Sequence, residues 1–320
     1  MKTGDKRLEK IFKEYALIGF LFLLCIVIVM VEPRFLSRSN LTNVLIQVSI
    51  NAFIATGMTF ILLTGGIDLS VGAVCALTGI LGSMLIKLMP TAGVPVMLAV
   101  TILLSAVVAV VCGGFSSILI CKFKVAPFIA TLAMLNIARG VCFILTNSKP
   151  IYGLPENFTW IGQGYIGPIP FLVILTVVVL LVSHIILSKT AYGRHVYAVG
   201  SNEEVAKLSG ISAWKIKTSV YMICAGLSAF AGICLSSKIG TAQPGAAEGY
   251  ELFAIAAVMG GTNLSGGYGG ITNTIVGIIA IGIINNGLSL MQVNSYWQKV
   301  AMGLIVAFAV IMDRLKVKEE

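Results

Sequence analysis

Charge is scarce in this sequence. Only 11% of its 320 residues are charged, whereas 58% are hydrophobic. The mean hydropathy of +0.98 lies far outside the balance of a water-soluble domain. This composition excludes a soluble globular protein and indicates an integral membrane protein, which we expect to form a single membrane domain over residues 1–320.

Reactive motifs are scarce as well. The two histidines, His184 and His195, have no nearby cysteine or carboxylate partners for a metal site and no nucleophile motif beside them. The seven cysteines form no CxxC pair and lie in or beside apolar runs, so we expect core residues and no disulfides. No GxxxxGK[ST] loop is present to bind nucleotide phosphates. The sequence therefore predicts a non-catalytic chain without a metal or cofactor of its own.

Apolar runs of membrane-spanning length recur along the chain. A bilayer core of about 30 Å requires roughly 20 apolar residues per crossing helix, and the runs lack the alternation of a β-barrel. We therefore predict an all-α polytopic bundle of about ten transmembrane helices. The expected ranges are 15–31, 44–63, 70–89, 94–120, 126–145, 168–188, 216–236, 250–261, 271–289 and 297–313, of which 250–261 is short enough to be re-entrant or tilted.

Basic residues predict the orientation of the bundle. With ten crossings and a cytoplasmic N-terminus, most of the 22 lysines and arginines fall on the cytoplasmic side, as the positive-inside rule requires. We therefore expect both termini in the cytoplasm, a cytoplasmic loop at about 189–215 and an external loop at about 147–168. The net charge of +9 then reflects membrane topology and not nucleic-acid binding.

The cytoplasmic loop contains the pattern of a short amphipathic helix. In NEEVAKLSGISAWKIK, which begins at Asn202, that asparagine is the expected N-cap and two glutamates occupy the first turn. Gly210 stands where a helix C-terminus favours glycine. A short capped helix in a cytoplasmic loop is expected to contact another protein.

A glycine-rich octapeptide occurs twice, as GGIDLSVG at 65–72 and GGTNLSGG at 260–267. At its fourth position Asp68 and Asn263 share a carbonyl-type oxygen but not a charge, which favours helix N-capping after a glycine reversal. A second interpretation stays open, in which paired broken helices line a central passage and Asp68 acts in gating or substrate contact. The residues of this predicted helix-break repeat are Gly65, Gly66, Asp68, Ser70, Gly260, Gly261, Asn263 and Ser265.

Polar side chains within the predicted helices are candidates for a solute path. Intramembrane polar residues tend to face the bundle interior and mark pathways. The candidates are Asn136, Arg139, Asn285, Asn286 and Gln292. The asparagines are equally compatible with hydrogen bonds between neighbouring helices, and Arg139 with a side chain that snorkels outward.

Four long segments resemble one family. TGGIDLSVGAVCALTG (64–79), YAVGSNEEVAKLSGI (197–211), AQPGAAEGYELFAIAAVMGGTNLSGGYGG (242–270) and NNGLSLMQVNSYWQKV (285–300) are similar to the permease subunit of ribose-type sugar ABC importers. The resemblance spans nearly the whole chain in the expected order. It implies a permease subunit for a monosaccharide, in a bacterial cytoplasmic membrane.

The resemblance also implies partners. Two ATPase domains, which use ATP and Mg, would dock on the cytoplasmic side, a sugar-binding protein would dock outside, and a second permease copy or paralogue would complete a dimer. The family's coupling helix, which contacts the ATPase, maps onto residues 201–211. The expected coupling residues are Ser201, Asn202, Glu203, Glu204, Ala206, Leu208, Ser209 and Gly210.

Other classes remain as alternatives. Permeases for nucleosides or branched-chain amino acids are the nearest, because their folds should be alike. An ion-coupled secondary transporter normally buries a titratable acid, and here Asp68 stands almost alone with Asn263 as its counterpart. An intramembrane enzyme and a channel are further alternatives, of which the channel would conduct without an ATPase.

Overall fold

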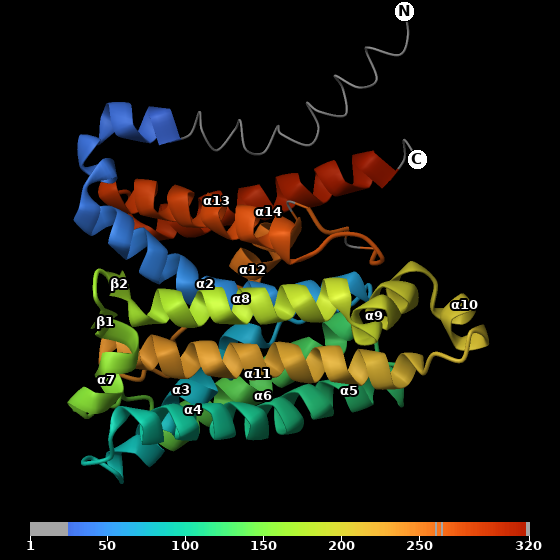
Figure 1. The fold of residues 1–320 in the computed structure, drawn as a ribbon, viewed down its shortest axis with the longest axis horizontal. Coiled ribbons are helices and arrows are strands. Elements are labelled where there is room, and N and C mark those ends of the chain that lie inside the picture. The colour runs from blue at the N-terminus through green and yellow to red at the C-terminus, as the bar shows by residue number, and fades with distance from the viewer. Residues whose placement is uncertain (1–24, 260, 264, 318–320) are drawn as a thin grey trace, which may run out of the picture.

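The computed structural model describes residues 25–259, 261–263 and 265–317, and these form a bundle of helices that run roughly side by side (Figure 1). Residues 25–31 are helical, and the last turn before α2 is the short helix η1, Pro33–Leu36. The longer helices are α2 (Arg38–Leu63), α3 (Val71–Lys87), α4 (Val94–Val108), α5 (Gly114–Cys121), α6 (Pro127–Thr146), α8 (Phe171–Lys189), α11 (Ala213–Ile239), α12 (Tyr250–Met259), α13 (Ile271–Leu290) and α14 (Ser295–Val317).

Six helices of the described chain are long and apolar enough to cross a membrane. They are α2, the continuous stretch Val94–Cys121, α6, α8, α11 and α13, while α3 and α12 are shorter apolar helices. The prediction that 250–261 is short is confirmed, because α12 spans only 10 residues. The part of the predicted 15–31 helix before Cys25 lies outside the described residues.

The interior of the bundle is built around α11 and α2. In the most apolar stretch of each helix, 61% of the residues are buried in α11 and 67% in α2, against 22% in α8. The helices cross closely where side chains are small: a Cβ on Gly232 in α11 would overlap the carbonyl oxygen of Cys75 in α3. A larger residue at this crossing would force the two backbones apart.

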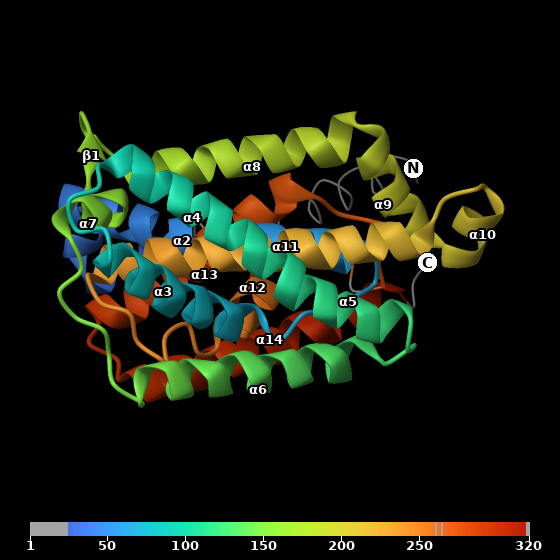
Figure 2. The ribbon, with the colours of Figure 1, turned by 90° about the horizontal axis from the view of Figure 1, so that it is seen from below.

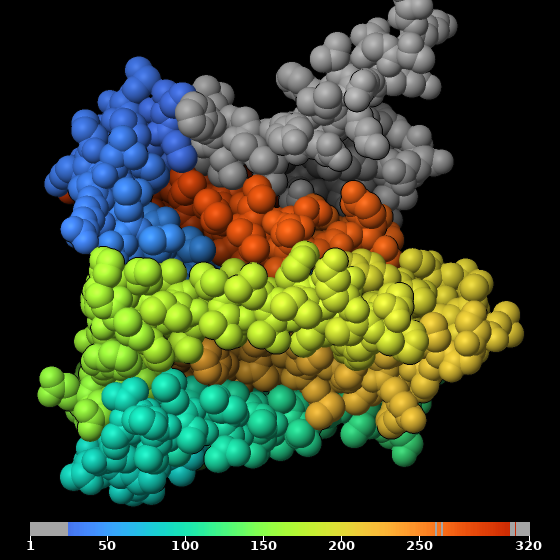
Figure 3. All heavy atoms as spheres, viewed as in Figure 1, coloured from blue at the N-terminus to red at the C-terminus, as the bar shows by residue number. Residues whose placement is uncertain are grey.

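The outer helices expose apolar side chains, as lipid contact requires. Figure 3 shows α8 running across one face of the bundle. Its exposed large apolar residues are Val177, Val178, Leu181, Val182 and Ile185. In water such a stripe would be costly, whereas in a bilayer it faces hydrocarbon.

The predicted helix 94–120 forms as one rod with an irregular centre. Between α4 and α5 the hydrogen bonding widens into a π-helical turn, η2, Ala109–Gly113. A Cβ on Gly113 would lie 2.7 Å from the carbonyl oxygen of Tyr221, so this turn touches the α11 backbone. Composition does not reveal a π turn, so none was expected here.

The two ends of the bundle carry different polar structures (Figures 1 and 2). At one end lie α7 (Glu156–Gln163) and a two-stranded antiparallel hairpin of β1 (Tyr165–Ile166) and β2 (Ile169–Pro170), with Tyr165 opposite Pro170. At the other end lie α9 (Ala191–Ser201) and α10 (Glu203–Leu208), and α10 projects beyond the rest. The loops expected at 147–168 and 189–215 therefore each contain an additional helix.

Candidate functional site

The projecting helix α10 begins as the sequence predicts. The Oδ1 atom of Asn202 accepts hydrogen bonds from the backbone N–H groups of Glu204, at 3.0 Å, and Val205, at 3.1 Å. These bonds satisfy two of the donors that every helix N-terminus leaves without a partner. The negative charges of the two glutamates in the first turn also interact favourably with the positive, N-terminal end of the helix dipole.

The C-terminus of α10 is closed by a glycine. The N–H of Ile211 donates to the carbonyl of Ala206 at 3.0 Å, and the N–H of Gly210 donates to that of Lys207 at 2.9 Å. This pair of bonds is a Schellman motif, which requires a left-handed residue. Gly210 supplies it with φ of +80°, so the predicted cap is confirmed.

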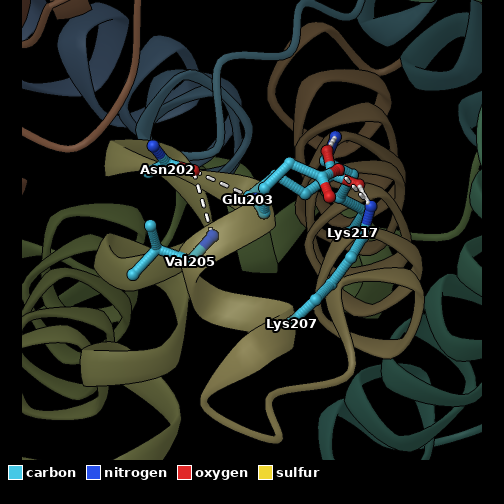
Figure 4. A network of polar contacts seen from close by, with 6 residues as sticks. Asn202, Glu203, Val205, Lys207 and Lys217 are labelled. Carbon is cyan, nitrogen blue, oxygen red and sulfur yellow. Dashed lines mark hydrogen bonds and ion pairs between the residues drawn. The ribbon is translucent and has the colours of Figure 1, made fainter.

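Ion pairs attach α10 to α11 (Figure 4). Glu203 pairs with Lys217, the fifth residue of α11, and with Lys207 at 2.9 Å. The hydrogen bond from Lys217, reinforced by Lys207, lowers the pKa of Glu203 to about 2. Hydrogen bonds to Glu204 and then Glu203 raise the pKa of Lys207. The carboxylate of Glu203 is therefore charged at neutral pH and joins the two helices.

Apolar side chains lie beside charged ones on the exposed surface of α10. Leu208 is 90% exposed and Val205 56% exposed, and Trp214, at the start of α11, is 53% exposed. In contrast, Ala206 is buried against the core and Ser209 bonds the carbonyl of Val205 through its hydroxyl. A six-residue helix that presents a nearly bare leucine is suited to insert into a pocket of another protein.

Three chain segments meet directly behind α10, at what we call the glycine junction, formed by residues 63–66, 200–201 and 265–267. The N–H of Gly267 donates to the carbonyl of Leu63 at 3.0 Å. A Cβ on Gly200, at the end of α9, would overlap that same carbonyl and lie 2.8 Å from the nitrogen of Gly267. A Cβ on Gly267 would lie 2.6 Å from the hydroxyl of Ser201. Only glycine allows backbones to approach this closely.

The junction also joins the two octapeptides to each other. A Cβ on Gly266 would lie 2.8 Å from the backbone nitrogen of Gly65. Gly65 itself has φ of +71°, a left-handed conformation that ends the turn after α2. Gly66 follows under the Tyr221 side chain, whose hydroxyl donates to the carbonyl of Ile67 at 3.3 Å. The motifs that repeat in the sequence are thus neighbours in space.

The polar side chains of the octapeptides form turns and not helix caps. The Oδ1 of Asp68 accepts from the N–H and hydroxyl of Ser70 at 2.7 and 2.6 Å, and the Oδ1 of Asn263 accepts from the N–H of Ser265 at 2.8 Å. Ser70 is itself the N-cap position of α3, without a side-chain cap bond. The predicted N-capping role is therefore wrong, because each side chain closes a turn on the residue two positions later. Gly261 donates to Val258, and Gly260 lies outside the described residues.

Two of the candidate path residues are buried in α13. Asn286 exchanges two hydrogen bonds of 2.9 Å with Asn40 of α2, so its amide has a helix-to-helix role. Asn40 also donates to the carbonyl of Phe35 at 2.9 Å, which ties η1 to this pair. Asn285, only 5% exposed, lies in the same turn of α13. Hydrogen bonding between helices, one of the two interpretations, describes Asn286.

The other three candidates lie elsewhere. Asn136 is exposed on α6 and donates to the carbonyl of Leu132 in its own helix. Arg139 does not snorkel outward, since it donates to backbone carbonyls of the chain between α11 and α12. Gln292 is exposed just after α13, with φ of +56°. Among the described residues, no hydrogen bond links any two of the five candidates.

Several residues of this region were not singled out from the sequence. Lys217 is one of several basic residues at positions 189–217, and only its contact with Glu203 distinguishes it. Gly200 is one of 34 glycines. Asn40 lies before the predicted helix start at 44, because α2 begins six residues earlier, at Arg38. Ser37 caps it there by accepting from the N–H of Asn40. The polar stretch SRSN could have been interpreted as a capped helix start.

The bundle, in which six of the described helices are long and apolar enough to cross a membrane, defines a polytopic membrane protein, and the capped helix α10 projects from one of its ends. The chain belongs to the family described as "Branched-chain amino acid transport system / permease component", whose model matches residues 40–310. It is 46% identical over 299 residues to the ribose import permease protein RbsC of Bacillus subtilis (strain 168), covering 92% of this chain and 91% of that protein.

Two further relatives extend the comparison. The ribose import permease protein RbsC of Escherichia coli (strain K12) is 40% identical over 309 residues, 95% of this chain and 94% of that protein. The L-arabinose transport system permease protein AraH of Escherichia coli (strain K12) is 34% identical over 313 residues, 97% of this chain and 93% of that protein. No solved structure matches the chain.

Proposed function

We propose that this chain is the permease subunit of a bacterial ATP-binding-cassette importer and that it forms the passage for a monosaccharide, ribose or a related sugar. The observation that carries the proposal is the 46% identity to a ribose import permease over 92% of this chain. A relative named for L-arabinose follows at 34% identity. A sugar is thereby favoured over the nucleosides and branched-chain amino acids that the fold alone would also accommodate.

The energy for transport comes from a separate ATPase subunit in this proposal. ATP and Mg are bound there, since this sequence carries no phosphate-binding loop. The exposed side chain of Leu208 supports a docking contact at α10. Movement of α10 would pass to α11 through the Glu203–Lys217 pair, and to α2 and the 265–267 loop through the glycine junction. A partner can shift a protein between two states only through such a differential contact.

The remaining architecture follows from the same proposal. About ten membrane-embedded helices form two repeated halves around the paired octapeptides, and both termini lie in the cytoplasm. A second permease copy or a paralogue completes the passage, and a sugar-binding protein docks at the end that carries α7 and the β1–β2 hairpin. The complex resides in the bacterial inner membrane. The apolar outer surface of α8 supports lipid contact.

The test is reconstitution in proteoliposomes with the ATPase and binding protein from the same organism. Labelled ribose should accumulate only with ATP, and unlabelled ribose or arabinose should compete while leucine and adenosine should not. A proton uncoupler should leave uptake unchanged. The permease alone should conduct no sugar. ATP-independent flux through the isolated chain, or competition by leucine, would refute the proposal.

A further inference from the structure

The chain between α11 and α12, residues 241–249, packs against the core of the bundle without forming a helix. Arg139 of α6 fixes its depth, because its guanidinium donates to the carbonyls of Pro244 at 2.7 Å and Ala246 at 2.9 Å. At 1.5 Å per residue, Arg139 lies about 10 Å from the C-terminal end of α6 and about 18 Å from its N-terminal end. Residues 244 and 246 therefore lie about 10 Å inside the C-terminal end of α6, whereas Ala242 pairs with Ile151, in the loop just beyond that end.

Irregular backbone at this depth is tolerated only where protein buries it or where it lines water, because lipid cannot bond its polar groups. One side of this segment is exposed and the other is buried. Gln243, Gly245 and Glu248 are exposed, whereas Ala242 and Ala247 are buried. Exposed amide and carboxylate groups are unfavourable in hydrocarbon. The exposed side must therefore face an aqueous space.

An ion pair with α14 also indicates that this segment faces water. Lys299 of α14 pairs with Glu248 at 3.2 Å, and the two side chains are 64% and 70% exposed. An ion pair this exposed requires water around it. The helices that hold the segment, α6 and α14, both lie at the edge of the bundle opposite α8 (Figure 2). Asn136, three residues before Arg139 and so on the same side of α6, is exposed as well.

We propose that residues 243–248 form a hydrogen-bonding wall of the solute passage, where Gln243, Glu248 and Asn136 contact sugar hydroxyls. Arg139 is a positioning residue that fixes the backbone of this wall. Neutral amides and one carboxylate bonded to a lysine suit a solute that has many hydroxyls and no charge, and exposed groups hold it weakly enough for release. The nature of the solute rests on the proposed function, whereas the contact with water does not.

Cysteine labelling in the membrane tests the contact with water. Cys25 and Cys121 are only partly buried, so the background carries Cys25→Ser and Cys121→Ser and keeps the five buried cysteines. A charged methanethiosulfonate reagent should modify Gln243→Cys roughly a hundredfold faster than Val178→Cys on the lipid face of α8, because charge is excluded from hydrocarbon to about that degree. Equal rates at the two positions would overturn the proposal.

Uptake by the full importer tests the contact with sugar. Gln243→Ala and Glu248→Ala should each lower uptake roughly tenfold at saturating binding protein, as expected for loss of a hydrogen bond to solute. Val178→Ala, at an exposed apolar residue of α8, is the control and should import sugar at the parent rate. Normal uptake by both wall variants would overturn the contact with sugar. Fast labelling at Gln243→Cys in a chain that imports no sugar would refute the proposed function but not the contact of residues 243–248 with water. Slow labelling in a chain that does import sugar would refute the proposal for residues 243–248 but not the proposed function.

The role of Arg139 has its own readout. Arg139→Met should change the labelling rate at Gln243→Cys several-fold, because two carbonyls lose the group that fixes them, and Arg139→Lys should restore part of it. A structural role elsewhere in α6 would leave this rate unchanged. That result would overturn the positioning role.

Discussion

Removing the N-cap of α10 should uncouple ATP hydrolysis from transport. In Asn202→Ala, the N–H groups of Glu204 and Val205 lose the oxygen that accepts from them at 3.0 and 3.1 Å. Loss of such a cap costs about 1 kcal/mol. A helix of six residues is too short to be stable alone. The ratio of folded to unfolded α10 should therefore fall about fivefold.

The assay is the amount of sugar imported per ATP hydrolysed in the reconstituted importer. Asn202→Ala should lower this ratio up to about fivefold, while Asn202→Asp, which keeps a capping oxygen, should stay near the parent value. The yield and the size-exclusion profile of the purified permease should not change, because α10 projects from one end of the bundle and contributes only Ala206 to its core. Equal ratios for the alanine and aspartate variants would refute the reasoning.

Three further changes have defined outcomes. Leu208→Asp should leave thermal stability within about 0.5 kcal/mol, since the side chain is nearly bare, but should abolish co-purification with the ATPase; retained binding would place the docking surface elsewhere. Gly200→Ala should destabilise the fold by about 1–3 kcal/mol through overlap with a backbone carbonyl, as a thermal shift would detect, whereas Gly140→Ala, in α6 with free space around it, should cost less. Hydrogen bonding lowers the pKa of Glu203 to about 2. The stabilisation from the contact of Glu203 with Lys217 is therefore complete above the ordinary pKa of 4.5 and is lost as the pH falls towards 2. Between pH 4.5 and pH 2, the fluorescence of Trp214 should change in the parent protein and change less in Glu203→Gln.

The membrane helices could be predicted from the sequence because the bilayer sets their length and polarity. The range 126–145 became α6 at Pro127–Thr146, and 271–289 became α13 at Ile271–Leu290. The additional helices α7 and α9 were missed because each is short and mixes polar with apolar residues. Their formation depends on contacts with the bundle, which no local pattern contains.

The candidate site also contains features that the sequence predicts and features that it does not. The cap of α10 was predictable, because Asn202 and Gly210 act within a few residues of themselves. The partners of Arg139 and Asn286 were not, because they lie more than a hundred positions away in the chain. Asp68 was assigned the correct acceptor chemistry but the wrong geometry, since the same oxygen can close a turn or cap a helix.

The glycine junction has a consequence for timing. At Gly200, Leu63 and Gly267 the chain touches itself backbone to backbone, with no long side chain between the segments that could change rotamer and absorb a displacement. A tilt imposed on α10 through α9 would therefore shift the turn after α2 and the turn before α13 in the same instant. The two octapeptides would therefore move together.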